Sequence, residues 1–324
     1  MKINQNDNYY RTISIFFIFI FLLIFFFSTG KVRAKAFEIT AVEISKPFEM
    51  GFNKNKVIDE GFRKAFNRLI LLVVNSSDQK KMNNVKLNEI KFMIESFSIK
   101  EEKFINEIYY LNLGVSFNRK KIFKYLEKKN IFPSIPNTKR LLYLPIVIEE
   151  DKKNIFIFTN NKIFKEWNKF KENHHLIEYV LPTEDLEDLE IIKKKYENLE
   201  QYNFKEIINK YYLDDAIISL IFKNKNKIRV LSRIIIKDDT YLKNSSFNGL
   251  DLNNPKHIEK VIKDLKTDFE DYWKTTNRIN TSIKLPLRVK VKSSSEKQIK
   301  IFENILEETD LIYDFFINKF DNQY

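Results

Sequence analysis

The chain contains three histidines, and two of them, His174 and His175, are adjacent with Glu172 and Glu178 nearby. Imidazole and carboxylate groups are the ligands that zinc uses where cysteine is absent. Adjacent side chains point in different directions on either a helix or a strand, so one ion cannot easily be held by both rings. No third ligand follows at a suitable spacing, and a solvated loop explains the pair. We therefore expect no metal ion at this position.

Carboxylates crowd the segment after Thr183, where they could form an acid–base pair or begin a helix. They are Glu184, Asp185, Glu187, Asp188 and Glu190. Acidic side chains in the first turns of a helix are stabilised by the positive end of its dipole. Nothing in the neighbouring sequence predicts a raised pKa for any of them. We interpret the run as a helix start.

Other common catalytic patterns are missing from the sequence. It has no G-x-S-x-G motif, its five glycines form neither a phosphate loop nor a dinucleotide fingerprint, and it has no cysteine. The lack of cysteine excludes disulfides, thiolate metal centres, thiol catalysis and a lipidated cysteine. These patterns predict a non-enzymatic protein that uses no cofactor.

Asn160, Asn161 and Trp167 are the residues that we single out as a ligand or partner surface. The two asparagine amides could face a ligand beside the indole ring. The alternative is structural: a turn and a helix cap, with Trp167 anchoring the helix to a sheet. Asparagine is a common cap and tryptophan is usually well buried, which favours the structural interpretation.

The N-terminal 36 residues have the order of a secretory signal peptide. Ile13–Phe27 is apolar except for Ser14, Lys2 and Arg11 precede it, and Ala34-Lys35-Ala36 follows it. We expect cleavage near Ala34–Ala36 and release into the periplasm, with membrane contact only through this segment before cleavage. The alternative is an uncleaved helix that anchors the chain in the inner membrane. The apolar run is shorter than the roughly 20 residues of a spanning helix, which favours cleavage.

The charge of the chain does not indicate nucleic acid as a partner. The 324 residues carry a formal charge of +12, and the lysines that supply it are spread along the sequence. Nucleic-acid-binding proteins usually concentrate basic residues in a patch or stripe. A composition that is 44% hydrophobic and 31% charged is globular. We expect a folded protein with a lysine-rich, solvated surface.

Residues 37–136 are expected to form an N-terminal α+β domain. Apolar residues alternate over 37–44 and 109–117, which predicts strands, and they recur at helical spacing over 56–74. A second helix is expected to bury Leu87, Ile90, Ile94 and Phe97.

Residues 137–254 are expected to form a central α/β domain. A near-continuous apolar run over 141–148 predicts a strand covered on both faces, in which Pro145 marks an edge or a bulge. Further strands are expected at 155–158, 177–181, 216–222 and 228–236. Residues 237–254 are expected to be a loop.

Residues 255–324 are expected to contain a long helix followed by a strand at 283–291, a helix at 296–308 and a strand at 311–317. A β-α-β order of this kind is half of a ferredoxin-like unit. The predicted fold class is therefore mixed α+β: two small sheet-plus-helix domains after a signal peptide, with this half unit at the C-terminus.

Several segments together resemble one family of exported proteobacterial proteins, domain of unknown function 2066. The matching segments are GFRKAFNRLILLVV (Gly61–Val74), IESFSIKEEKF (Ile94–Phe104), LGVSFNRKKIFKYLEKKNI (Leu113–Ile131), RLLYLPIVIEE (Arg140–Glu150), FTNNKIFKEWNKF (Phe158–Phe170) and LPTEDLEDLEII (Leu181–Ile192). The resemblance covers most of residues 37–236 and implies export, without implying any catalytic residue. Residues 183–222 are also similar to small envelope domains of the TolB amino-terminal or CsgG-like kind, a likeness of fold alone.

These observations predict a periplasmic, non-enzymatic adaptor or accessory protein that binds another envelope protein through an α/β surface. The alternative is a binder of small molecules or nucleotides, or an unrecognised hydrolase. That alternative requires a deep pocket with converging polar groups, bordered by Asn160, Asn161 and Trp167.

Overall fold

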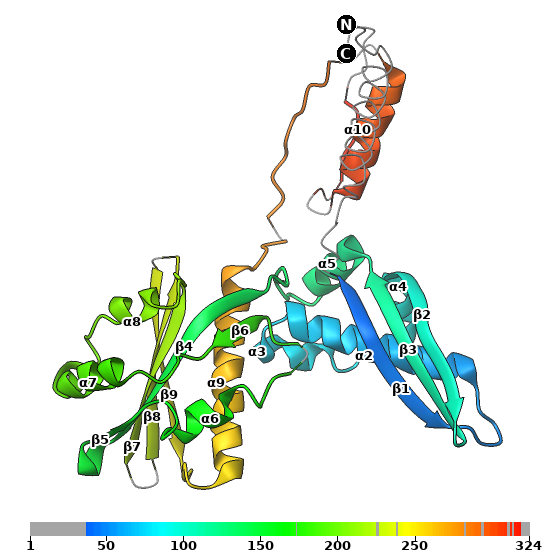
Figure 1. Cartoon of the computed structure of the whole chain (residues 1–324). Helices are drawn as coiled ribbons and strands as arrows, with labels where there is room; N and C mark the ends of the chain where they lie inside the picture. The colour runs from blue at the N-terminus through cyan, green and yellow to red at the C-terminus, as the bar shows by residue number, and fades with distance from the viewer. Residues whose placement is uncertain are drawn as a thin grey trace, which may run out of the picture. The chain divides into compact units, whose positions relative to one another are not determined.

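The computed structural model describes residues 37–318, except 173, 225–226, 238, 282, 293–294, 310–311 and 313. The expected signal peptide, residues 1–36, lies outside the described residues. The described chain forms two β-sheets with helices packed on them, which confirms the mixed α+β class (Figure 1). No helix in this part of the chain combines the length and the apolar character needed to cross a bilayer.

The first sheet is antiparallel and has the strand order β1-β3-β2. Its strands are β1 (Glu38–Pro47), β2 (Ile94–Ile105) and β3 (Ile108–Phe117). Helix α2 (Lys54–Val73) packs on one face, because Phe62, Phe66 and Leu69 recur at helical spacing and are buried. The shorter helices of this part are α3 (Ser76–Gln79), η1 (Lys80–Met82), α4 (Leu87–Met93) and α5 (Arg119–Lys128).

The helix expected to bury Leu87, Ile90, Ile94 and Phe97 ends earlier than the sequence indicates. α4 stops at Met93, and Ile94 already begins β2, so Phe97 lies on a strand. The apolar residues of this stretch fit two periods, since Ile90, Ile94 and Phe97 have helical spacing while Phe97 and Ile99 alternate with serines. Pairing with β3 over the whole of β2 decides in favour of the strand.

The second sheet has the order β5-β4-β7-β8-β9, with β6 also paired to β4. Its strands are β4 (Lys139–Glu149), β5 (Asn154–Phe156), β6 (Ile177–Val180), β7 (Ala216–Asn224), β8 (Lys227–Ile236) and β9 (Asp239–Asn248). Strand β4 runs parallel to β6 and β7, and the remaining pairs are antiparallel. A loop was expected over 237–254, and this prediction is wrong for β9. The sequence of β9 is largely polar and has no clear strand pattern, so its backbone pairing with β8 defines the strand.

Helices cover both faces of the second sheet and create a core on each (Figure 1). On one face, α6 (Lys162–Trp167) and α9 (Pro255–Thr276) pack against Tyr143 and Ile221. On the other face, α7 (Leu186–Lys194) and α8 (Lys205–Asn209) pack against Ile146 and Ile218. Two single turns, η2 (Glu150–Lys152) and η3 (Tyr196–Asn198), lie in the connections. Strand β4 contributes to both cores, as its continuous apolar run predicts.

Helix α9 belongs by packing to the central sheet, although the sequence placed it in a separate C-terminal segment from residue 255. Ile258, Leu265 and Phe269 of α9 lie in the same core as Tyr143. The six-residue α6 covers only part of this sheet face. The apolar stripe of α9 covers the rest.

Pro145 lies in β4 at a point where one side of the strand is unpaired. β6 pairs with β4 as far as Leu142, and β5 pairs with it from Val147 onward. The Leu142 N–H faces β7 and donates to the carbonyl of Asp215. Alternate residues of a strand point these groups to opposite sides, so the Pro145 nitrogen faces the unpaired gap. β4 is a central strand, but at Pro145 it has no neighbour on the side that the proline nitrogen faces. The edge position expected for Pro145 is therefore confirmed for this residue alone.

The C-terminal tail after α9 contains helix α10 (Glu296–Glu308). A strand was expected at 283–291, but residues 283–292 form no strand in the structure. The second expected strand, 311–317, lies partly outside the described residues. The ferredoxin-like half unit therefore stays a prediction.

Candidate interaction surface

Asn161 is the cap of α6 and is only 1% exposed. Its Oδ1 accepts the backbone N–H groups of Ile163 at 2.9 Å and Phe164 at 3.2 Å. Its Nδ2 donates to the carbonyl of Pro145 at 3.0 Å, in the gap that β5 and β6 leave beside β4. The structural interpretation, a helix cap, is confirmed for Asn161.

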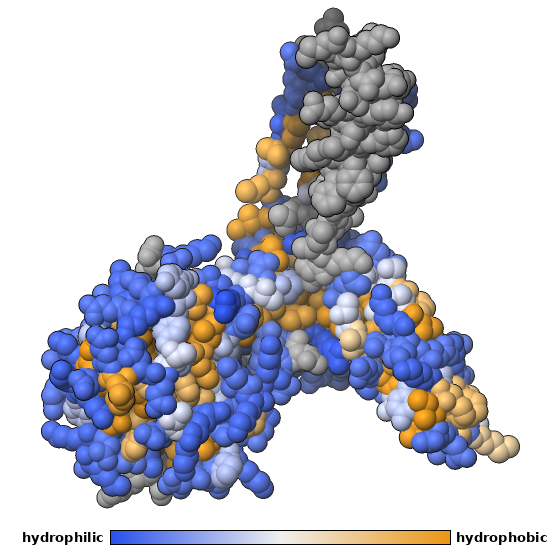
Figure 2. Space-filling model, viewed as in Figure 1, coloured by the Kyte–Doolittle hydropathy of each residue, from blue (hydrophilic) through white to orange (hydrophobic). Residues whose placement is uncertain are grey.

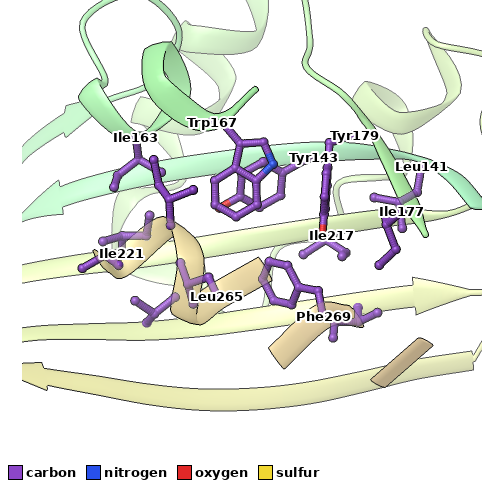
Figure 3. Packing of buried hydrophobic residues seen from close by; sticks show 14 of the residues in the cluster. Leu141, Tyr143, Ile163, Trp167, Ile177, Tyr179, Ile217, Ile221, Leu265 and Phe269 are labelled. Carbon is purple, nitrogen blue, oxygen red and sulfur yellow. The ribbon is translucent and has the colours of Figure 1, made fainter. Parts of the chain in front are cut away.

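Trp167 is a core residue, as Figure 3 shows. Its ring stacks on Tyr143 with centroids 3.8 Å apart and meets Tyr179 edge-on at 5.3 Å. Because Asn161 and Trp167 are both buried, the surface expected from Asn160, Asn161 and Trp167 is wrong for two of its three residues. Asn160 alone of the three is exposed.

Asn160 borders a small hollow that is partly open to solvent. The hollow is lined by Ile155, Ile157, Phe158, Asn160, Glu184, Leu189 and Lys193. Thr159 Oγ1 donates to Glu184 Oε1 at 3.1 Å beside it. This hollow is what remains in support of a small-molecule site near Asn160.

The adjacent histidines are half-buried, with ring centroids 5.0 Å apart. Among the described residues, no group of three or more histidine and carboxylate side chains is placed to hold a metal ion. His175 Nδ1 accepts the backbone N–H of Glu172 at 3.3 Å. Burial, followed by the neighbouring charge of His174, lowers the pKa of His175 to about 4. His175 is therefore neutral at physiological pH and closes a short turn.

The acidic run after Thr183 does begin a helix. Asp185 caps α7 by accepting the N–H of Glu187 at 2.8 Å. Lys210 Nζ lies 2.9 Å from Asp185 Oδ2 and 2.6 Å from Oδ1 of the buried Asp188. The hydrogen bond from Lys210 lowers the pKa of Asp185. The helix-start interpretation is confirmed, and the carboxylates have structural partners.

Three charged side chains of α9 are buried, and the sequence analysis missed them. Lys266, Glu270 and Lys274 are each at most 4% exposed. Their spacing of four residues puts them on one face of the helix, and that spacing was the available signal. Their burial could not be inferred, because equally spaced charges more often lie on a solvated face.

Two of these charges bind backbone groups around the second sheet. Lys266 Nζ donates to the carbonyls of Trp167 and Phe170, both at 2.8 Å, at the end of α6. Glu270 accepts the two backbone N–H groups at the start of β6, both at 2.9 Å. Burial lowers the pKa of Lys266 to about 8, and burial also raises the pKa of Glu270. Both side chains therefore have a positioning role for α6 and β6.

The third charge joins α9 to the first sheet's long helix. Lys274 Nζ donates to the carbonyl of Leu71 at 2.6 Å and to that of Val74 at 3.3 Å, at the C-terminus of α2. Asp271 Oδ1 accepts the N–H of Ser76 at 2.8 Å beside it. Orphan carbonyls at a helix end need such donors. This part of α9 thus ties the two sheets together.

Strand β2 has an open outer edge. It has 12 residues, all but the first of them exposed, and in the described part of the chain it pairs with β3 alone. Along it lie large exposed apolar side chains, continued by the loop after β1. We name as the β2 surface the residues Phe48, Met50, Phe97, Ile99 and Phe104. Hydrophobic residues gather at the end of this sheet, at the lower right of Figure 2.

The strand residues of the β2 surface lie on the same face of the sheet as α2. Phe97 is opposite Val115 and Phe104 is opposite Tyr109, and both β3 residues are buried. The β2 side chains extend past the helix, so Phe97 stays 48% exposed and Phe104 57% exposed. Incomplete coverage by α2 is therefore the reason that this apolar row faces solvent.

Ring contacts hold the β2 surface in place. Phe97 meets Phe62 of α2 edge-on, with ring centroids 5.1 Å apart. Phe104 meets Phe48 edge-on at 4.9 Å, and Phe48 contacts Phe52 at 4.7 Å. Aromatic pairs in these geometries are attractive beyond the area they bury. The exposed rings are therefore pre-positioned for a partner.

A polar cluster crosses the β2 surface between its apolar residues. Glu102 accepts hydrogen bonds from Lys54 Nζ at 2.7 Å and from the Tyr109 hydroxyl at 2.8 Å. The bond from Lys54 lowers the pKa of Glu102. Burial, and then the bond to Glu102, raises the pKa of Tyr109 to about 12. The surface therefore combines apolar contacts with a fixed charge pair, as many protein interfaces do.

In comparisons with known proteins, no family model matches the chain and no curated protein sequence matches it. The resemblance to domain of unknown function 2066 therefore stays a prediction.

Proposed function

We propose that this protein is an exported, non-enzymatic adaptor of the cell envelope that binds a β-strand of another envelope protein along β2. One observation carries the proposal: the open edge of β2 lies beside the exposed apolar side chains of the β2 surface. An added strand pairs its backbone with such an edge, and its alternate side chains pack on the exposed apolar row.

An added strand can pair regularly with only a short part of β2. β2 has irregularities between Ile94 and Ser96 and between Ile99 and Glu101, while its register with β3 is continuous from Glu101 to Ile105. Bulges protect an edge against indiscriminate pairing. We therefore expect the partner strand to be short and to depend on side-chain contacts with the β2 surface for its specificity.

The proposed location is the periplasm, with the signal-like N-terminus removed near Ala34–Ala36. The order of charged, apolar and small residues over 1–36 supports export. An uncleaved N-terminal helix is the alternative and would hold the same adaptor at the inner membrane. The alternative is a small-molecule binder or a hydrolase. Asn161 and Trp167 no longer support it because both are buried, and the hollow beside Asn160 is its remaining support.

Photo-crosslinking in cells tests the proposed function. A photoreactive amino acid is placed at Phe97 or Phe104 of the full chain, and at Tyr212, which is 97% exposed and far from β2 in the sequence, as a control. We expect the two β2 positions to crosslink to one and the same envelope protein, and position 212 to give no such product. Equal labelling of that protein from position 212 would contradict the proposal.

Matched serine variants distinguish specific binding at the β2 surface from nonspecific hydrophobic binding. Phe104→Ser removes a residue of the β2 surface, whereas Phe92→Ser removes an aromatic side chain that is 67% exposed outside it. With the probe at position 97, Phe104→Ser should reduce the crosslink about tenfold, as expected when an interface aromatic is truncated. Phe92→Ser should leave it unchanged. Circular dichroism verifies that both variants are folded.

A further inference from the structure

Residues 283–292, which we name the basic segment, alternate apolar and cationic side chains along a chain that joins neither sheet. Its apolar residues Ile283, Leu285, Leu287 and Val289 are between 56% and 86% exposed. The residues between and after them include Lys284, Arg288, Lys290 and Lys292, and no acidic residue occurs in the segment. In an extended chain, alternate residues lie on opposite sides, so one side is apolar and the other cationic.

The point from which the basic segment leaves the folded core is fixed. Arg278 forms an isolated antiparallel bridge with Ser134, and the Ile279 N–H donates to the carbonyl of Pro133 at 2.8 Å. Lys284 Nζ then lies 3.4 Å from a carboxylate oxygen of Glu127 on α5. The apolar side chains that follow stay exposed.

We propose that the basic segment binds the surface of an anionic lipid bilayer. Its apolar side chains enter the interface, and its lysine and arginine side chains reach the anionic headgroups. Clusters of lysine and arginine bind anionic leaflets by charge attraction, and long cationic side chains extend from an apolar surface to place their charge in water. This site is separate from β2 and does not depend on the proposed function. It also differs from the expectation that the membrane is contacted only through residues 1–36.

The pattern of the basic segment favours a bilayer over a protein or a soluble polyanion. A polyanion would neutralise the cations and leave four large apolar side chains exposed. A strand partner would meet Pro286, which has no N–H and interrupts the ladder. A second copy of the segment would bring like charges together. An anionic bilayer satisfies both sides of the segment at once.

A fluorophore at Leu287 tests this proposal, and the lack of cysteine in the chain allows unique labelling. Leu287→Cys in the full chain carries an environment-sensitive dye, and Leu242→Cys on β9, where the leucine is 57% exposed, is the matched control. Vesicles containing phosphatidylglycerol should increase and blue-shift the emission from position 287 only. Pure phosphatidylcholine vesicles should change it little, even if the N-terminal apolar run inserts into both.

Charge variants complete the test. Replacing Arg288, Lys290 and Lys292 by glutamine should weaken the dye response to phosphatidylglycerol vesicles about a hundredfold, since each cation near an anionic surface contributes roughly a fivefold factor. An unchanged response in this variant would overturn the proposal. So would an equal response to phosphatidylcholine, or a response that grows with protein concentration without vesicles and so indicates a protein partner.

Discussion

The Asn161 side chain makes four hydrogen bonds that close a gap in the second sheet. It accepts two N–H groups at the start of α6 and donates to the carbonyls of Pro145 and Phe156. Asn161→Ala removes the cap and leaves a buried carbonyl without a donor. We expect the free energy of unfolding in urea to fall by about 1–3 kcal/mol. The exposed neighbour is the control: Asn160→Ala should change it by less than about 0.5 kcal/mol. Equal losses from both variants would contradict the role given to Asn161.

Lys266 predicts an unusual pH dependence of stability. Its pKa in the folded protein is about 8 against an ordinary value of 10.5, and its side chain is 2% exposed. Between these values the unfolded chain binds a proton that the folded chain does not, so stability increases as pH rises. The contribution is fully present above pH 10.5 and is lost as pH falls through 8.

Lys266→Met isolates this contribution, because other groups titrate in the same range. From pH 8 to 10.5 the stability of the unmodified chain should rise relative to the variant by about 1.4 kcal/mol per pH unit. Urea unfolding at several pH values measures the difference. A constant difference across this window would show that burial does not lower the pKa of Lys266.

Gly61 sets how closely α2 approaches the first sheet. A Cβ at this position would overlap with Leu113 Cδ1 and lie 2.8 Å from Ile44 Cδ1, and both side chains are buried. Gly61→Ala gains about 1 kcal/mol of helix propensity but overpacks the helix–sheet contact, which costs about 1–3 kcal/mol. We therefore expect a net loss of stability in urea unfolding. A more stable variant would show that the contact relaxes freely.

The elements with one clear period could be predicted from the sequence. α2 and α9 have helical stripes, and β3 and β4 have the alternating and continuous apolar patterns of their environments. β9 could not be predicted, because its identity comes from pairing with β8 and its own side chains are largely polar. For β2 two periods fit the same residues, and backbone pairing with β3, the next strand of the hairpin, decides between them.

The candidate site, too, could be predicted from the sequence only in part, because it depends on how the elements pack. The sequence offered both a site and a structural role for Asn161 and Trp167, and only the packing of α6 on β4 distinguishes them. The β2 surface was not predicted at all. Phe97 and Phe104 are exposed because α2 does not cover the β2 side of the sheet. Whether one element covers another that is distant in the sequence cannot be inferred from the local pattern of residues.

At the scale of the whole molecule, the buried end of α9 couples the two sheets. Lys274→Met removes the donor to the two carbonyls at the end of α2 and keeps a similar volume. Both tryptophans, Trp167 and Trp273, lie in the core of the second sheet, so their fluorescence reports that sheet, while circular dichroism reports the whole chain.

These two probes give a test of coupling. For the unmodified chain we expect one urea transition with coincident midpoints. For Lys274→Met we expect the fluorescence and circular dichroism midpoints to separate. Coincident midpoints in the variant would mean that the sheets are coupled without this contact.

Strand addition at β2 is the central claim. Amide hydrogen exchange tests it most directly, measured on the protein alone and in complex with the envelope partner that crosslinking identifies. Alone, the amides of residues 95–105 that face the open edge should exchange rapidly. In the complex we expect alternate amides in this range to become protected, because a new backbone ladder forms there. The amides of β9, an edge strand of the second sheet, should stay unchanged. Unchanged exchange along β2, or protection confined to a different element, would contradict the claim.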